Sequence, residues 1–157
     1  MLSRCHRIHH RYLQSVDKEL YGHLEREEIE PQMHLLRWIR CILNREFLLA
    51  DAIHLWDAIF SCASIEVENK NVEFTGRLDP SREFILLDFL CVAMLVFVRG
   101  HLLESDNTGC LMRLLKFPPV EDVQELVRMA VKYRDYIFSG NLAKPSLTPT
   151  PAAPSQP

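Results

Sequence analysis

The sequence has no surplus of basic residues and few glycines, and these two shortages argue against whole classes of function. Its 157 residues carry 18 lysines and arginines against 21 aspartates and glutamates, so the net charge is −3 with histidine neutral. A nucleic-acid-binding protein needs a basic surface to release counterions, and this chain has no basic excess for one. Only five glycines are present, and neither the GxxxxGKS/T pattern nor GxGxxG occurs, so no phosphate-cradling loop is recognisable.

Cysteine spacing argues against a disulfide framework or a zinc knuckle. The five cysteines are widely separated, with no CxxC or CxH cluster; they are Cys5, Cys41, Cys62, Cys91 and Cys110. An odd count at wide spacing is typical of reduced thiols in a cytosolic protein, several of which fill the core.

The sequence also lacks an apolar run long enough to span a membrane. The longest candidate covers residues 84–98, contains Asp88 and ends before Arg99. A membrane-spanning helix needs about 20 apolar residues, so this stretch is predicted to be a buried helix. An unpaired charge in a protein core is costly, and Asp88 is therefore expected to find a donor. Residues 1–11 are basic and histidine-rich, unlike a secretory signal.

Most of the chain has the periodicity of amphipathic helices, and no alternation typical of strands is visible. Apolar residues at helical spacing, together with capping and proline signals, predict an all-α fold of about six to seven helices. The expected helices cover residues 5–15, 18–28, 31–44, 48–61, 84–103, 108–116 and 121–138. Asp17 is the expected N-cap of the second of them.

The pattern also predicts which side chains face the core. The large residues expected to be buried are Trp38, Trp56, Phe89 and Met94. In residues 48–61 the expected inner face consists of Leu49, Ala52, Ile53, Trp56, Ile59 and Phe60. The expected outer face of the same helix consists of Asp51, His54 and Asp57.

Two polar stretches interrupt or follow the helices. Residues 69–83 are expected to form a loop, and residues 140–157 hold five of the nine prolines and no aromatic residue. The second stretch cannot bury enough apolar surface to order itself, so the prediction is a helical domain over 1–139 and a disordered tail over 140–157. Two PxxP matches in the tail fit a polyproline-groove partner, although a plain solvated end is the simpler interpretation.

Three histidines near the start of the chain share one helix face. His6, His9 and His10 lie at positions i, i+3 and i+4, a spacing that can hold a transition metal. No aspartate, glutamate or cysteine completes a set at close spacing, which favours solvated or packed histidines. No metal site and no cofactor are predicted.

The most informative stretch is RWIRCILNREF at residues 37–47, followed by LWDAIF at residues 55–60. It predicts two amphipathic helices joined at a short charged corner, across which Arg37, Glu46 and Asp57 could pair and so hold the fold together. Arg40 lies on the polar face with no acidic neighbour one turn away, so it is a candidate partner contact. The signature residues of this stretch are Arg37, Trp38, Glu46, Phe47, Trp56 and Asp57.

This stretch resembles the late signature of the TBC domain, the all-helical catalytic domain of Rab GTPase-activating proteins. DKELYGHL at residues 17–24, IEPQ at 29–32, CVAML at 91–95, LMRLL at 111–115 and DV at 122–123 are similar to segments around it. The resemblance covers the C-terminal half of the domain, with features of the branches called members five and thirteen. It implies a Rab GTPase as partner, a role in vesicle trafficking and a cytoplasmic location, with peripheral association with endomembranes.

The two catalytic motifs of that family are missing from their places. The resemblance implies an arginine finger in an IxxDxxR motif and a glutamine finger in a YxQ motif, and a finger arginine is worth about 10³ to 10⁵ in rate. Tyr12-Leu13-Gln14 matches YxQ in letters but lies directly before DKELYGHL, where the family has an ordinary helix. The expectation is a chain that is catalytically incomplete and holds no catalytic residue.

Two alternatives to this interpretation remain open. One is a non-catalytic helical binding module for a small GTPase or adaptor. The other is an unrelated helical enzyme that uses His54, Asp57 or the His6–His10 cluster.

Overall fold

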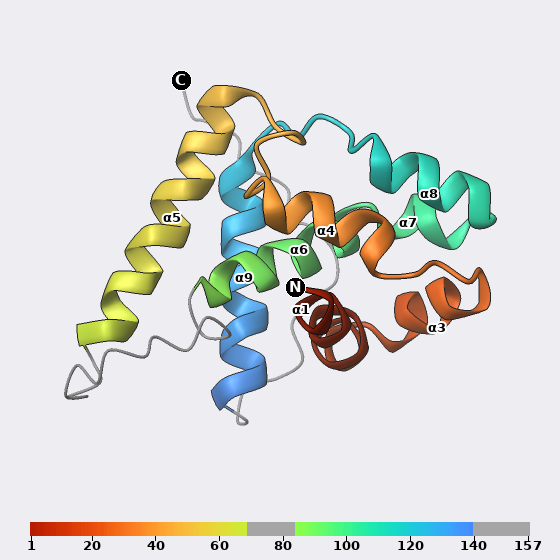
Figure 1. Cartoon of the computed structure of the whole chain (residues 1–157), viewed down its shortest axis with the longest axis horizontal. Helices are drawn as coiled ribbons and strands as arrows, with labels where there is room; N and C mark the ends of the chain where they lie inside the picture. The colour runs from red at the N-terminus through yellow and green to blue at the C-terminus, as the bar shows by residue number, and fades with distance from the viewer. Residues whose placement is uncertain (69–83, 140–157) are drawn as a thin grey trace, which may run out of the picture.

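The computed structural model describes residues 1–68 and 84–139, and every regular element in these two ranges is a helix (Figure 1). The elements are α1 (Leu2–Arg7), the π-helical η1 (Ile8–Leu13), α2 (Gln14–Val16), α3 (Lys18–Arg26), α4 (Gln32–Arg40), α5 (Leu49–Glu68), α6 (Ile85–Phe97), α7 (Arg99–Leu103), α8 (Asn107–Leu115) and α9 (Val123–Ser139). The all-α prediction is confirmed. The loop predicted at residues 69–83 and the tail predicted at 140–157 lie outside the described residues.

The observed helices follow the predicted ones closely at their starts. The backbone N–H of Leu20 donates to Asp17 Oδ1 at 3.1 Å, so Asp17 caps α3 as expected. One helix was predicted over residues 84–103, but the chain breaks at Val98 into α6 and α7. The side chain of Val98 is buried, so the break lies inside the packed region, two residues before Gly100 of α7.

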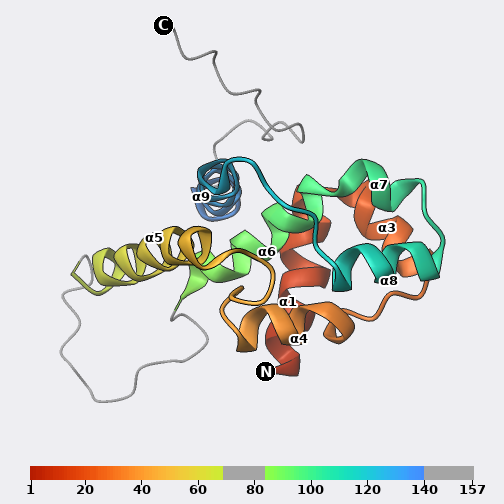
Figure 2. The same ribbon diagram turned by 90° about the horizontal axis from the view of Figure 1, so that it is seen from above.

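Helix α6 forms the centre of the molecule. All its residues from Ile85 to Val96 are buried, and it contacts α9, η1, α5 and α4. Figures 1 and 2 show α9 crossing it, α5 at one end of the molecule and α3, α7 and α8 grouped at the other. The predicted buried helix is confirmed, and no helix among the described residues is long and apolar enough to cross a membrane.

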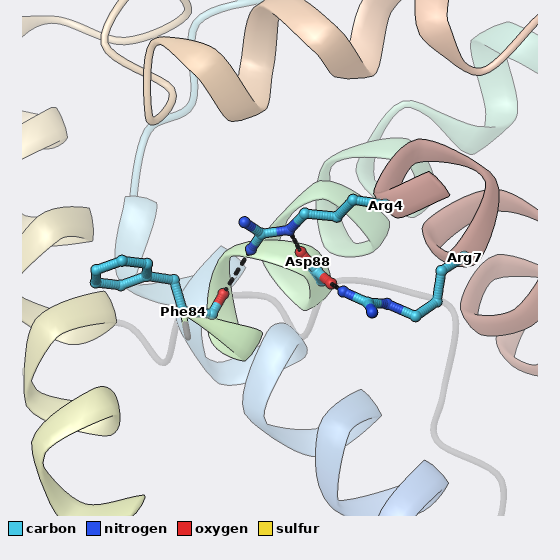
Figure 3. A network of polar contacts seen from close by, with 4 residues as sticks. All are labelled: Arg4, Arg7, Phe84 and Asp88. Atoms are coloured by element: carbon cyan, nitrogen blue, oxygen red, sulfur yellow. Dashed lines mark hydrogen bonds and ion pairs between the residues drawn. The ribbon is translucent and has the colours of Figure 1, made fainter. Parts of the chain in front are cut away.

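Asp88 is the one charged residue in the buried part of α6, and two arginines hold it (Figure 3). Arg4 Nε donates to Asp88 Oδ1 at 2.5 Å, and Arg7 Nη2 donates to Oδ2 at 3.1 Å. Arg4 also donates from Nη2 to the carbonyl of Phe84 at 3.0 Å, just before α6 begins. Burial raises the pKa of the Asp88 carboxyl, and the two arginines oppose that rise. The expectation that Asp88 finds a donor is confirmed.

Helices α3 and α4 end in the same unusual way. After α3 the N–H of Ile29 donates to the carbonyl of Leu24 at 2.9 Å, and Glu28 has a φ of 54°. This is the Schellman arrangement, in which the left-handed position is usually glycine. After α4 the left-handed position is Ile42, with a φ of 45°.

The end of α4 also corrects a predicted boundary. The N–H of Leu43 donates to the carbonyl of Trp38 at 2.9 Å, and Leu43 itself has a φ of 63°. The chain therefore turns out of the helix after Arg40, and the predicted helix over residues 31–44 is four residues too long at its C-terminal end.

The inner face of α5 differs from the predicted one. Its buried residues are Ala52, Leu55 and Ile59, whereas Leu49 and Ile53 are exposed. Leu49, Ile53 and Phe60 were expected on the inner face, so that prediction is wrong for all three. Trp38, Phe89 and Met94 are buried as expected, and Trp56 is half-buried. The apolar surface of α5 extends further around the helix than the part that α6 and α9 cover.

Candidate functional site

All the signature residues except Asp57 come together at the turn between α4 and α5, which we call the α4–α5 corner (residues 41–48). Arg37, near the end of α4, donates from Nη2 to Glu46 Oε2 at 2.7 Å. The same nitrogen lies 2.5 Å from the carbonyl oxygen of Leu115, the last residue of α8. The C-terminal carbonyls of a helix lack partners within the helix, so Arg37 caps α8 while holding the corner.

The carboxylate of Glu46 is almost completely withdrawn from solvent. Its side chain is 2% exposed, against 27% for that of Arg37. Burial raises the pKa of the Glu46 carboxyl, and the hydrogen bond and charge of Arg37 oppose that rise. The predicted pairing of Arg37 with Glu46 is therefore present, and its geometry suits a structural contact.

The residues that follow Arg37 and Glu46 in the sequence, Trp38 and Phe47, belong to an aromatic cluster. Trp38 is fully buried and meets the ring of Phe117 edge-on, with 5.8 Å between centroids. Phe47 also packs on Phe117, at 5.7 Å. Trp56 of α5 donates from Nε1 to the carbonyl of Ile42 at 2.8 Å, which ties the strained end of α4 to the next helix. The corner is therefore held by one ion pair, one indole hydrogen bond and an aromatic cluster.

Asp57 does not join this network. It lies on the exposed side of α5 and makes no hydrogen bond or ion pair with the described residues. The spacing allowed Asp57 to pair with Arg37 across the corner, but its side chain is exposed and does not make that contact. Arg40, the predicted partner contact, is exposed at the end of α4, with no ion pair to the part of the chain described.

The structure adds a surface that sequence reasoning missed. Leu49 is 66% exposed and Ile53 is 44% exposed, and Phe60 follows on the same face of α5. We call these three residues the α5 stripe. The ring of Phe60 meets that of Phe84 edge-on at 5.7 Å, so the stripe ends against the start of α6. Its signal in the sequence was the apolar character of α5 over more than one face.

The two defining residues of the YxQ match, Tyr12 and Gln14, lie in different surroundings. Tyr12 is buried and stacks on Phe89, with 4.7 Å between ring centroids. Gln14 lies on the exposed side of α2. Burial raises the pKa of the Tyr12 phenol, as expected of a core residue.

The histidines near the start of the chain have an acidic neighbour that sequence spacing did not reveal. His9 Nε2 lies 3.0 Å from Glu25 Oε1 on α3, and His10 Nδ1 lies 3.2 Å from the Tyr21 hydroxyl. Burial lowers the pKa of His9, which is fully buried. His6 is exposed and stacks on His10 at 5.1 Å between centroids. The other residue set suggested for an enzyme, His54 with Asp57, is exposed on α5.

A cysteine–histidine pair is also present but is not arranged as a nucleophile. Cys110 Sγ lies 3.9 Å from His23 Nε2, which is 3.0 Å from the carbonyl oxygen of Ser105. Burial raises the pKa of the Cys110 thiol, so the thiolate that attacks is disfavoured.

Comparison with known proteins agrees with the resemblance seen in the motifs. The family model described as the Rab-GTPase-TBC domain matches residues 2–97. TBC1 domain family member 5 homolog B of Dictyostelium discoideum is 41% identical over 132 residues, which are 84% of this chain and 11% of that protein. No solved structure shows significant similarity to the chain.

Relatives from both expected branches are present. Human TBC1 domain family member 5 is 33% identical over 135 residues, covering 86% of this chain and 15% of that protein. Human TBC1 domain family member 13 is 36% identical over 124 residues, covering 78% of this chain and 26% of that protein. The chain thus spans between about a tenth and a quarter of the length of these relatives, and it belongs to the Rab-GTPase-TBC domain family.

Proposed function

We propose that this chain is the part of a Rab GTPase-activating protein that supplies scaffold and partner-binding surface, and that it lacks the groups that act on the nucleotide. The observation that carries the proposal is the family match over residues 2–97 in a sequence without the two finger motifs in their places. Family membership argues against the alternative of an unrelated helical enzyme built on His54, Asp57 or the histidine cluster. A Rab partner, a role in vesicle trafficking and a cytoplasmic or endomembrane-associated location belong to this proposal.

Several arginines are held in ion pairs by acidic side chains, which supports the proposal that this chain has no arginine finger. Arg4 and Arg7 are committed to Asp88, Arg37 to Glu46, and Arg99 to Asp17. A finger must be free to reach into another protein and offset charge on the transferring phosphoryl group. An arginine held by a buried carboxylate would have to break that contact first, which is costly.

The α5 stripe and Arg40 together are the proposed contact for the GTPase. Large apolar side chains exposed together on one helix face commonly mark a protein–protein interface. Arginine is enriched at such interfaces, and Arg40 is exposed with no ion pair to the described residues. The α4–α5 corner positions both features, because Trp56 and the Arg37–Glu46 pair hold the end of α4 against α5.

A charge substitution in the stripe tests this surface with a closely matched control. Ile53→Lys places a cation in the apolar stripe, whereas His54→Lys adds a cation at the next residue of the same helix, which is exposed and polar. We expect Ile53→Lys to weaken binding to a GTP-loaded Rab more than about tenfold, as loss of an interface anchor does, and His54→Lys to leave it unchanged. Arg40→Ala should weaken binding to a smaller degree.

The readout is calorimetric titration against a panel of Rab proteins loaded with a non-hydrolysable GTP analogue. Equal affinities for the unchanged chain, Ile53→Lys and Arg40→Ala would contradict the proposed contact. In that case the stripe would be a packing surface for the rest of a longer protein.

The second candidate is a non-catalytic helical binding module. The exposed α5 stripe favours this module as strongly as it favours part of a GTPase-activating protein. The two candidates differ in whether fingers are supplied by another part of the same protein. A polyproline-groove partner for the tail is part of neither argument, since residues 140–157 lie outside the described ranges.

A further inference from the structure

Three side chains of metal-ligand type converge where η1 lies against α3. They are His9 and His10 of η1 and Glu25 of α3, and one ligand atom of each lies within 4.8 Å of the other two. His9 Nε2 and Glu25 Oε1 are the tightest pair, at 3.0 Å. Sixteen residues of sequence separate them, so spacing along the chain gave no sign of the carboxylate.

We propose that His9, His10 and Glu25 bind a divalent transition metal ion of the zinc class. Imidazole and carboxylate ligands suit zinc, and bonds of about 2.0 to 2.2 Å in a tetrahedral site place neighbouring ligand atoms about 3.3 Å apart. The His9–Glu25 pair already has nearly that separation. Small side-chain rotations of His10 and Glu25, neither of which is fully buried, would complete the set.

The π-helical winding of η1 explains how two successive histidines serve one site. In an ordinary α-helix adjacent side chains point in clearly different directions. Hydrogen bonds from residue i to i+5 put more residues into each turn and bring successive side chains closer in direction. The segment Ile8–Leu13 is wound this way between the α-helical α1 and α2. Single π-helical turns inside α-helices occur frequently at functional sites.

The surroundings of the cluster favour a cation. A cavity of about 640 Å³ opens beside it, lined among others by His6, His10, Glu25, Glu28 and Glu30. The lining contains these three glutamates and no lysine or arginine. Metal and solvent can therefore reach His10 and Glu25 from the cavity, and His6, stacked on His10, is positioned to supply a fourth ligand or leave that position to water.

A second contact can orient one of the ligands. His10 Nδ1 lies 3.2 Å from the hydroxyl oxygen of Tyr21. With the proton on Nδ1 donated to that oxygen, Nε2 of His10 keeps its lone pair for a metal. A hydrogen bond of this kind fixes the tautomer of a metal-binding histidine.

The bound ion would brace two helices. His9 and His10 belong to the first helical run and Glu25 to α3, and the chain turns between them at Asp17. A ligand that binds only the folded state stabilises it, so metal would raise the unfolding temperature of the chain. This effect is independent of Rab binding.

Titration of the full 157-residue chain with Zn²⁺, and with Co²⁺ as a spectroscopic probe, tests the site. We expect one equivalent of Zn²⁺ to bind, the visible bands of tetrahedral Co²⁺ to appear, and the melting temperature to rise. His10→Asn and Glu25→Gln each remove one ligand from a side chain that is not fully buried, so both variants should fold. Each should weaken Zn²⁺ binding more than about tenfold, since even outer-shell losses reach that size.

The matched control is His54→Asn, which removes an exposed histidine far along the chain. It should bind Zn²⁺ as the unchanged chain does. Three results would overturn the proposal: no saturable binding of Zn²⁺, full affinity in Glu25→Gln, or an equal loss in His54→Asn. The last result would mean adventitious binding to surface histidines.

Discussion

Arg37 and Glu46 lock the α4–α5 corner, because the guanidinium donates to the buried carboxylate at 2.7 Å and also contacts the last carbonyl of α8. The side chain of Arg37 therefore connects the end of α4, the α4–α5 corner and the end of α8. The Glu46 carboxylate makes no other hydrogen bond or ion pair with the described residues, and its Oε1 is buried without a hydrogen bond. Loss of Arg37 would leave a desolvated charge inside the fold.

Arg37→Ala should lower the free energy of unfolding by about 3 kcal/mol, the lower end for breaking a buried ion pair, since Arg37 is partly exposed. Urea unfolding followed by circular dichroism measures the change. Arg45→Ala, at an exposed position of the same corner, is the control and should change stability by less than about 0.5 kcal/mol. An unchanged unfolding midpoint in Arg37→Ala would show that the pair does not hold the corner.

The loss of stability caused by Arg37→Ala should become smaller as the pH falls. Burial raises the pKa of Glu46, and Arg37 provides the main opposing interaction. Without Arg37 the folded state binds the Glu46 proton more tightly than the unfolded state does, so protonation favours folding. The stability difference between the two proteins should therefore be smaller at about pH 5 than at about pH 8. A difference that is constant over this range would contradict a buried Glu46 charge.

The two arginines around Asp88 should be strongly coupled. Either one alone still partners the buried carboxylate, whereas Arg4→Ala with Arg7→Ala leaves it stranded. We expect the double variant to lose more stability than the sum of the single variants by about 1 kcal/mol or more. The coupling should vanish when the same cycle is made in an Asp88→Asn background. Additive losses with Asp88 present would be inconsistent with the network in Figure 3.

His34 should make the protein sensitive to acid. It is fully buried against Trp38, neither of its ring nitrogens has a hydrogen-bond partner among residues 1–68 and 84–139, and burial lowers its pKa to about 3. As the pH falls below about 6.5, the unfolded chain takes up a proton that the folded chain refuses. Its contribution to stability is therefore present above about pH 6.5 and is lost between there and about pH 3.

His34→Phe tests this, because a phenyl ring fills the same place and cannot titrate. The variant should lose less stability than the unchanged chain between about pH 6.5 and about pH 4, with the slopes differing by up to about 1.4 kcal/mol per pH unit. Parallel stability curves would mean that His34 gains a partner on protonation.

Glu28→Gly should stabilise the protein by about 1 kcal/mol. Glu28 is exposed and holds the left-handed position after α3, with a φ of 54°, where a side chain costs about 1 to 2 kcal/mol relative to glycine. Glu27→Gly is the control, since Glu27 has a φ of −81° and gains nothing from glycine. It should destabilise by about 0.5 to 1 kcal/mol. Thermal unfolding of both variants gives the comparison.

The C-terminal ends of α3 and α4 were hard to predict because residues other than glycine hold the left-handed positions after them. Apolar spacing placed the helices correctly, but glycine is the usual stop signal and neither Glu28 nor Ile42 is glycine. The predicted helices therefore run past Arg26 and Arg40. The break at Val98, two residues before Gly100, was not predicted either.

The site was predictable where partners are close in sequence. Arg37 and Glu46 are nine residues apart on either side of a corner, and their pairing was foreseen. Leu49, Ile53 and Phe60 were placed on the wrong face because α5 is apolar over two faces, and only its contacts with α6 and α9 decide which face is covered. The meeting of His9 with Glu25 depends on the turn at Asp17, which spacing alone cannot reveal.

Single-turnover GTP hydrolysis by a panel of Rab proteins, with and without this chain, tests the central claim most directly. A finger arginine supplies about 10³ to 10⁵ in rate, and we expect the chain alone to give no acceleration of that size. Acceleration of about a thousandfold would contradict the account. If it disappeared in Gln14→Ala, the Tyr12-x-Gln14 match would be a true glutamine finger; if it disappeared in Arg40→Ala, the arginine finger would lie at the end of α4.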